Sequence, residues 1–193
     1  MSRIRTLVAL LVVGLLAVPV AAAPAKSKKK SETVKVSRGA TTLTLDKDTA
    51  KTLTDLGLSL APIGPARAAT GGVAFPVTTG TLDAKSYAGI IRHTGGLRIS
   101  SSSTHVDLNN PRIVVDGAPD LTAQVGSGPR LSIADLDLGD ATIAAKGGRL
   151  SITGVVVRLS DGAAAALNDA FGTDALKGGI VLGTADVDTR VRK

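Results

Sequence analysis

Gly89–Leu97 reads GIIRHTGGL, and the rest of the chain can be organised around this stretch. The apolar run before His93 is typical of a strand, and Thr94-Gly95-Gly96 supplies the glycines that a tight turn with positive φ requires. The pattern therefore predicts two strands, 88–93 and 97–101, joined as a hairpin. His93 lies at the edge of this turn, beside Gly95 and Gly96.

Short apolar runs separated by turn residues continue on both sides of this stretch. A spacing of about 8–12 residues between turns is typical of an all-β domain. We therefore expect a mainly β fold of twisted antiparallel sheets, either a sandwich or a partly open barrel. Pro76 is expected to place its strand, 71–77, at an edge or a bend. The other predicted strands are 34–38, 41–46, 58–63, 104–108, 111–116, 121–125, 131–138, 150–159 and 180–191.

Two short helices are expected, near 47–57 and 161–171. Each follows a strand, begins at a residue that can cap it, and ends at a glycine. Asp46 or Asp48 is the expected cap of the first helix, and Ser160 or Asp161 that of the second. Two such helices could cover the two ends of a sandwich or barrel.

Two strands change the face of their large apolar residues partway along. The change falls at Ala134-Asp135 in 131–138 and at Gly154 in 150–159. Because side chains alternate faces along a strand, each change requires an extra residue or a twist. We predict β-bulges at both places.

The N-terminus is typical of an exported protein. Arg3 and Arg5 precede an apolar run and an alanine-rich site, which together predict a signal peptide over 1–25, cleaved after Ala22 or Ala25. The expected order is this signal peptide, a basic disordered tail over 26–38 and one domain over 39–193. The protein is then secreted or at the cell surface, with no transmembrane segment after cleavage.

The charge of the chain, formally +7, comes from its N-terminal part. Lysines and arginines balance aspartates from Gly39 onward, and the aromatic residues are few, so nucleic acid is not an expected partner. The lysines of Lys26–Lys30 could hold the protein to an anionic cell-wall polymer or an envelope protein. The alternative is that this stretch is a solvated linker.

No enzyme motif and no metal-ligand pattern is present. Ser100–Ser103 beside His105 is interpreted as a polar hairpin tip, and Asp135–Asp140 as a strand with outward aspartates. The remaining candidate ligand-binding residues are His93, Tyr87 and His105. On one continuous strand, Tyr87 and His93 would lie about 20 Å apart.

From about residue 72 to 187 the chain resembles the HtaA domain, a secreted haem-binding module of bacterial haem-uptake systems. The matching pieces follow the family's order: Phe75-Pro76 with Gly80, His93-Thr94-Gly95-Gly96-Leu97, Asn110-Pro111-Arg112-Ile113, Leu121–Val125, Leu131–Leu138, and Leu159–Ala163 with Phe171 and Gly178-Gly179.

The resemblance implies a β-rich fold with two short helices. It also implies haem held mainly by a tyrosine from an early aromatic motif, with a supporting histidine that maps onto His93. The corresponding early region, 41–57, contains no tyrosine, which favours a shared fold without haem binding. Two hypotheses follow: a non-catalytic envelope domain that binds a partner or wall polymer, and a carrier of haem or another hydrophobic ligand.

Overall fold

The structure is a computed structural model that describes residues 32–193. The predicted signal peptide and Lys26–Lys30 lie outside the described residues. The elements are β1 (Thr33–Leu45), α1 (Lys47–Asp55), β2 (Ser59–Ile63), β3 (Arg67–Ala69), β4 (Gly72–Asp83), β5 (Gly89–His93), β6 (Gly96–Ser100), β7 (His105–Val115), β8 (Asp120–Val125), β9 (Arg130–Asp137), β10 (Thr142–Lys146), β11 (Arg149–Leu159), α2 (Asp161–Phe171) and β12 (Val181–Arg192).

Eight antiparallel strands close into a barrel. Their order is β7-β5-β4-β1-β12-β11-β9-β8, and the pairing of β7 with β8 completes the ring. β10 pairs with β11, and β3 with β4, outside this path. The expected mainly β fold with two short helices is therefore confirmed, and the architecture is a closed barrel with extra strands.

The predicted hairpin at Thr94-Gly95-Gly96 is wrong. β5 and β6 do not pair with each other; both pair with β7, β5 along Arg112–Val115 and β6 along His105–Asn109. They are thus two parts of one interrupted strand that runs antiparallel to β7. The predicted strands 104–108 and 111–116 are likewise one strand, whose hairpin with β6 has the serine-rich tip expected from the sequence.

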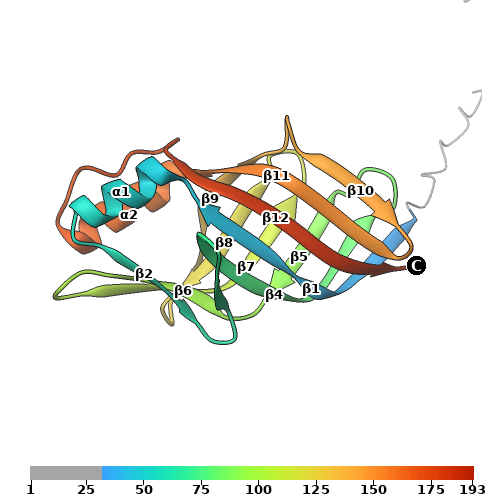
Figure 1. Ribbon diagram of the computed structural model, residues 1–193, viewed down its shortest axis with the longest axis horizontal. Coiled ribbons are helices and arrows are strands. Elements are labelled where there is room, and N and C mark those ends of the chain that lie inside the picture. The colour runs from blue at the N-terminus through green and yellow to red at the C-terminus, as the bar shows by residue number, and fades with distance from the viewer. Residues whose placement is uncertain (1–31) are drawn as a thin grey trace, which may run out of the picture. The chain divides into compact units, whose positions relative to one another are not determined.

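Both strands are distorted at the level of this interruption. Gly95 has φ +83°, and its carbonyl accepts from the backbone N–H of Asn110, which has φ +49° on β7. A Cβ at Gly95 would lie 2.3 Å from the backbone nitrogen of Ala66, in the β2–β3 connection. Beyond the interruption, β6 pairs with β2 on its other edge. Glycine here lets β6 and β2 pack closely beside the barrel (Figure 1).

Both helices lie at the same end of the barrel (Figure 1), so the expectation of one helix at each end is wrong. Their predicted caps are confirmed: the Asp46 carboxylate accepts from the backbone of α1, and the Ser160 hydroxyl from that of α2. Each cap contributes about 1 kcal/mol. Under the helices an apolar cluster forms from α2 and strands β6, β7, β8, β9 and β11, while a separate cluster fills the rest of the barrel.

The two predicted bulges are present. In β11 the register with β12 shifts between Ile152 and Val155, and Gly154 has φ +77°. In β9 the extra residue is Ile133, one position before the predicted pair, because Leu121 faces Ala134 while Thr122 faces Ser132. Leu131, at the start of this strand, is 41% exposed.

The predicted tail is too long, because the chain is already in β1 from Thr33. Pro76 lies inside the barrel strand β4. It stands between the part of β4 that pairs with β3 and the part that pairs with β5, next to a register shift after Val77. A proline fits there because the ladder on that edge is already interrupted.

Two glycine variants separate close packing from backbone strain alone. Gly95→Ala should lower the free energy of unfolding by about 3 kcal/mol or more, because strain and a backbone clash add. Gly154→Ala shares the positive φ but has its nearest contact at 3.9 Å, so it should cost about 1 kcal/mol. Urea unfolding of both variants measures the difference, and equal losses would contradict the packing account.

Candidate functional site

A cavity of about 130 Å³ lies at the helical end of the barrel, where the apolar clusters meet. Apart from His93 and three threonines, every side chain that lines it is apolar. The lining comes from all eight barrel strands, from β2 and β6, and from both helices. The interruption between β5 and β6 therefore places His93 and Leu97 on the wall of the same cavity.

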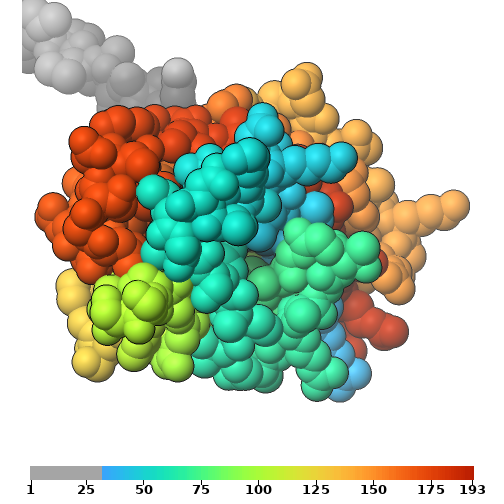
Figure 2. Space-filling view, turned by 60° about the vertical axis from the view of Figure 1, so that its left-hand side comes forward, coloured from blue at the N-terminus to red at the C-terminus, as the bar shows by residue number. Residues whose placement is uncertain are grey.

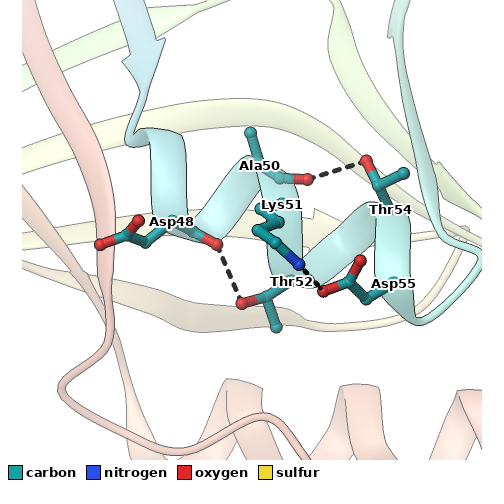
Figure 3. A network of polar contacts seen from close by, with 6 residues as sticks. All are labelled: Asp48, Ala50, Lys51, Thr52, Thr54 and Asp55. Atoms are coloured by element: carbon teal, nitrogen blue, oxygen red, sulfur yellow. Dashed lines mark hydrogen bonds and ion pairs between the residues drawn. The ribbon is translucent and has the colours of Figure 1, made fainter.

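Helix α1 covers this cavity on the outside. Figure 2 presents the helical end and shows α1, in cyan, across its middle. Thr49, Thr52 and Leu53 of α1 line the cavity. The Thr52 hydroxyl donates to the Asp48 carbonyl at 2.9 Å within the helix, as Figure 3 shows. Its hydrogen bond is thus made inside α1, not across the cavity.

His93 is the one ionisable side chain in the lining, and it is 5% exposed. Its Nδ1 lies 3.2 Å from the carbonyl oxygen of Pro111, and its Nε2 lies 2.7 Å from the Thr41 hydroxyl. A carbonyl can only accept, so Nδ1 carries the hydrogen and donates to Pro111. Nε2 is then unprotonated, and its lone pair accepts a hydrogen bond from the Thr41 hydroxyl.

Burial keeps this imidazole neutral. The pKa of His93 is lowered from 6.5 to about 4, because the apolar surroundings disfavour the imidazolium; the hydrogen bond to Pro111 opposes this shift. At neutral pH His93 therefore presents an uncharged nitrogen donor. An N–H held by a backbone carbonyl also fixes the ring's orientation, as is usual for metal-binding histidines.

The polar groups of the lining are all satisfied within the protein. Thr41 bonds His93, Thr49 donates to the Val181 carbonyl at 2.6 Å, and Thr52 donates within α1. Among residues 32–193, no buried side-chain polar atom lacks a partner. The cavity therefore offers a ligand an apolar surface and one polar atom, His93 Nε2, whose hydrogen bond from Thr41 a ligand could replace.

The three candidate residues from the sequence are not brought together. Tyr87 lies in the turn before β5, with φ +58°, and packs on the barrel's main apolar cluster, so it is not in the cavity lining. His105 is exposed where β7 begins. Gly96 begins β6 opposite Asn109, and Gly95 makes the interruption. Of the three, only His93 lines the cavity.

Sequence reasoning missed Thr41, which is buried on β1 and bonds His93 across 52 positions of sequence. Its alternation with Leu43 and Leu45 was the available signal, because all three line the cavity. In residues 32–193 no three acidic or histidine side chains form a possible metal site. Neither helix in that range has the length and apolar content required to cross a bilayer.

The buried neutral histidine makes stability depend on pH. Above pH 6.5 the imidazole is neutral in both the folded and the unfolded chain, so it does not lower the free energy of unfolding there. Between pH 6.5 and about 4, the unfolded chain binds a proton that the folded chain excludes, so the free energy of unfolding falls. At pH 4 this loss should reach about 3 kcal/mol, at about 1.4 kcal/mol per pKa unit.

Urea unfolding of the wild type and His93→Gln at pH 7 and pH 4 measures this effect. The wild type should lose about 3 kcal/mol more than the variant over this interval, since glutamine does not titrate. His105→Gln, at an exposed position, should follow the wild type. Parallel pH profiles for the wild type and His93→Gln would refute a strongly lowered pKa.

Comparison with known proteins identifies relatives of this fold. The HtaA family model, described as Htaa, matches residues 52–175. The crystal structure of the C-terminal domain of HtaA from Corynebacterium glutamicum covers 82% of this chain and 99% of its own, with TM-score 0.65 and 16% identity. The haem-binding protein HtaB from the same organism covers 84% of this chain and 97% of its own, with TM-score 0.52 and 11% identity.

A domain-swapped dimer of a histidine-to-alanine variant of that HtaA domain also matches, with TM-score 0.54 and 19% identity over 75% of this chain and 92% of its own. Among curated proteins no match was found. At these identities the structural likenesses show a shared fold, whereas the family model covers more than half of the sequence. The chain therefore belongs to the HtaA family and carries a binding domain of HtaA type.

Proposed function

We propose that this domain binds a hydrophobic ligand, non-catalytically, in the cavity beside His93, and that haem is the ligand to test first. The observation that carries the proposal is the lining itself: an apolar wall with one neutral imidazole nitrogen and no unsatisfied polar group. Binding sites for small molecules are typically apolar pockets with few polar contacts.

The residues present fit haem in part. The apolar lining suits a macrocycle, and His93 Nε2 is a nitrogen that can bind iron once Thr41 releases it. Haem would supply the iron and a large flat apolar surface. The tyrosine that the family resemblance implies is not in the lining, and the side chain bonded to His93 Nε2 is Thr41. Any iron ligand from the lining would thus be an imidazole.

The size of the cavity adds a requirement. Pockets for drug-sized ligands measure about 300–1,000 Å³, more than twice the 130 Å³ found here. A macrocycle would therefore need α1 to move outward. α1 follows β1 and leads into β2, and its Thr49 hydroxyl donates to the Val181 carbonyl on β12, so an outward movement would have to break this hydrogen bond.

Titration of the purified protein with hemin tests the proposal. We expect a Soret band that saturates at one hemin per chain. His93→Ala should shift this band and weaken hemin binding at least tenfold, because it removes the nitrogen that can bind iron. His105→Ala is the matched control and should bind as the wild type, since His105 is exposed outside the cavity.

A second probe separates iron binding from apolar binding. Iron-free protoporphyrin, followed by its fluorescence, should bind the wild type and His93→Ala alike, because the apolar wall is unchanged. If neither hemin nor protoporphyrin binds to the folded protein, the proposal is refuted. Protoporphyrin binding without hemin coordination would keep the apolar site and exclude His93 as an iron ligand.

Thr41→Val isolates the hydroxyl that occupies His93 Nε2. The substitution keeps the shape and removes the donor, so it should cost about 1–3 kcal/mol of stability, because the buried Nε2 is left unpaired. If Nε2 binds iron, hemin affinity should stay the same or increase, because the hydroxyl no longer competes. A loss of affinity as large as that of His93→Ala, measured by the same titration, would contradict this role.

We also propose that the protein acts outside the cell or at its surface, after removal of the signal peptide predicted over residues 1–25. The family resemblance, to a secreted module, supports this location. Attachment to an anionic wall polymer through Lys26–Lys30 stays a sequence-based prediction, because these residues lie outside the described range.

A further inference from the structure

The barrel end opposite the helices gathers exposed cations from four adjacent strands. Figure 1 shows the C-terminus and β10 at this end. Although the sequence from Gly39 onward is balanced in charge, the fold separates its charges: along the exposed face of β12, Asp186 and Asp188 are followed by Arg190 and Arg192. We call the following set the basic row: Lys35, Arg38, Lys146, Arg149, Arg190 and Arg192.

The basic row places like charges directly opposite one another. Lys146 faces Arg149 across the β10–β11 pair, and Arg149 faces Arg190 across the β11–β12 pair. Lys35 faces Arg192 across the β1–β12 pair. Residues directly opposite on one face are about 5 Å apart, and like charges in such pairs destabilise a sheet. A run of such pairs breaks a local rule of sheet design, as functional surfaces do.

Acidic residues compensate little of this charge. Arg149 pairs with Asp188 at 2.6 Å, and the terminal Lys193 with Glu32 at 2.9 Å. The Lys35 ammonium contacts a hydroxyl, that of Thr81. No ion pair to Arg38, Lys146, Arg190 or Arg192 occurs within residues 32–193. The positive charge is therefore available to an external anion.

The backbone supports this arrangement at a bulge in β1. The register with β12 shifts between Ser37 and Gly39, and Arg38 between them has φ +57°, a conformation unfavourable for a side chain other than glycine. The hydroxyl of Thr189, 1% exposed, donates to the Arg38 carbonyl at 2.8 Å. A buried contact thus holds an exposed arginine in a strained conformation beside Arg190.

We propose that the basic row binds a linear anionic polymer through its phosphate or carboxylate groups. Lys146, Arg149 and Arg190 follow one another across three strands, and the Lys35–Arg192 pair lies two positions further along β12. The cations thus extend over four neighbouring strands, as binding of a chain-like anion requires. A membrane surface usually also needs exposed apolar side chains; the large ones exposed in residues 32–193 are Leu131 and Ile143, outside the row. No aromatic residue belongs to the row, so base stacking gives no preference for nucleic acid.

Binding of inorganic polyphosphate and of polyglutamate tests the proposal, by titration at several salt concentrations. The background is the chain beginning at Lys26 with Lys26, Lys28, Lys29 and Lys30 changed to glutamine, so that only the barrel contributes. In this background, Lys35→Gln, Arg190→Gln and Arg192→Gln together should weaken binding at least tenfold. The slope of log affinity against log salt should fall by about two to three.

The matched control removes three exposed cations elsewhere: Lys47→Gln, Arg67→Gln and Lys177→Gln. It has the same net charge and should bind within twofold of the background. Binding of polyphosphate alone or polyglutamate alone would support the proposal and identify the anionic group. Equal weakening by both triple variants, or no salt-dependent binding of either polymer, would overturn it.

Two further probes exclude the other kinds of partner. Vesicles with phosphatidylglycerol that bind more tightly than either polymer would overturn the proposal in favour of a membrane. An oligodeoxythymidylate that binds more tightly than polyphosphate of equal charge would overturn it in favour of nucleic acid. Hemin binding should be the same in the background and both triple variants, so this test is independent of the cavity.

Discussion

The interruption shared by β5–β6 and β7 is the constraint on which the rest of the structure depends. β7 closes the barrel by pairing with β8, and on its other edge it pairs first with β6 and then with β5. At the junction, Gly95 packs against the backbone near Ala66 and bonds Asn110. This single arrangement separates β6 and β2 from the barrel wall, opens room for the cavity and ends β5 at His93.

His93 links this constraint to the chemistry of the site. Its ring joins β1 to β7, through Thr41 and the Pro111 carbonyl, so two hydrogen bonds satisfy a buried ring and fix its tautomer. A buried imidazole with only one bond would leave a polar atom unpaired at a cost of about 1–3 kcal/mol. The same two hydrogen bonds stabilise the fold and hold the ring in an orientation in which Nε2 could bind a ligand. Measurements of both stability and ligand binding are therefore needed to separate the structural role of His93 from its binding role.

The sequence predicted what depends on neighbours along the chain. The helix caps Asp46 and Ser160 and the bulge at Gly154 follow from local residues, and each is present. The hairpin at Gly95 failed because a glycine pair between two apolar runs gives the same signal whether the chain reverses or only breaks. β6 pairs with residues 105–109 of β7, and the sequence of the turn at Gly95 carries no information about this pairing.

In the site, too, local features were predictable from the sequence and long-range contacts were not. His93 was a candidate because of its position next to the glycines, whereas its partner Thr41 lies 52 residues earlier and the cavity wall is assembled from most of the barrel. Tyr87 was a candidate because it is the only tyrosine. Tyr87 lies six positions before His93, in the turn before β5, and this turn packs it on the barrel core outside the cavity.

The position of α1 has a kinetic consequence. Because α1 covers the cavity and contributes Leu53 to its wall, the proposed ligand, which is larger than the present cavity, would enter and leave by a movement of this nine-residue helix. Entry would then be slower than diffusion, and a bound molecule would be retained for as long as the helix stays docked. For a domain that acts outside the cell, as proposed above, slow release would be as valuable as tight binding, because free ligand there is quickly diluted.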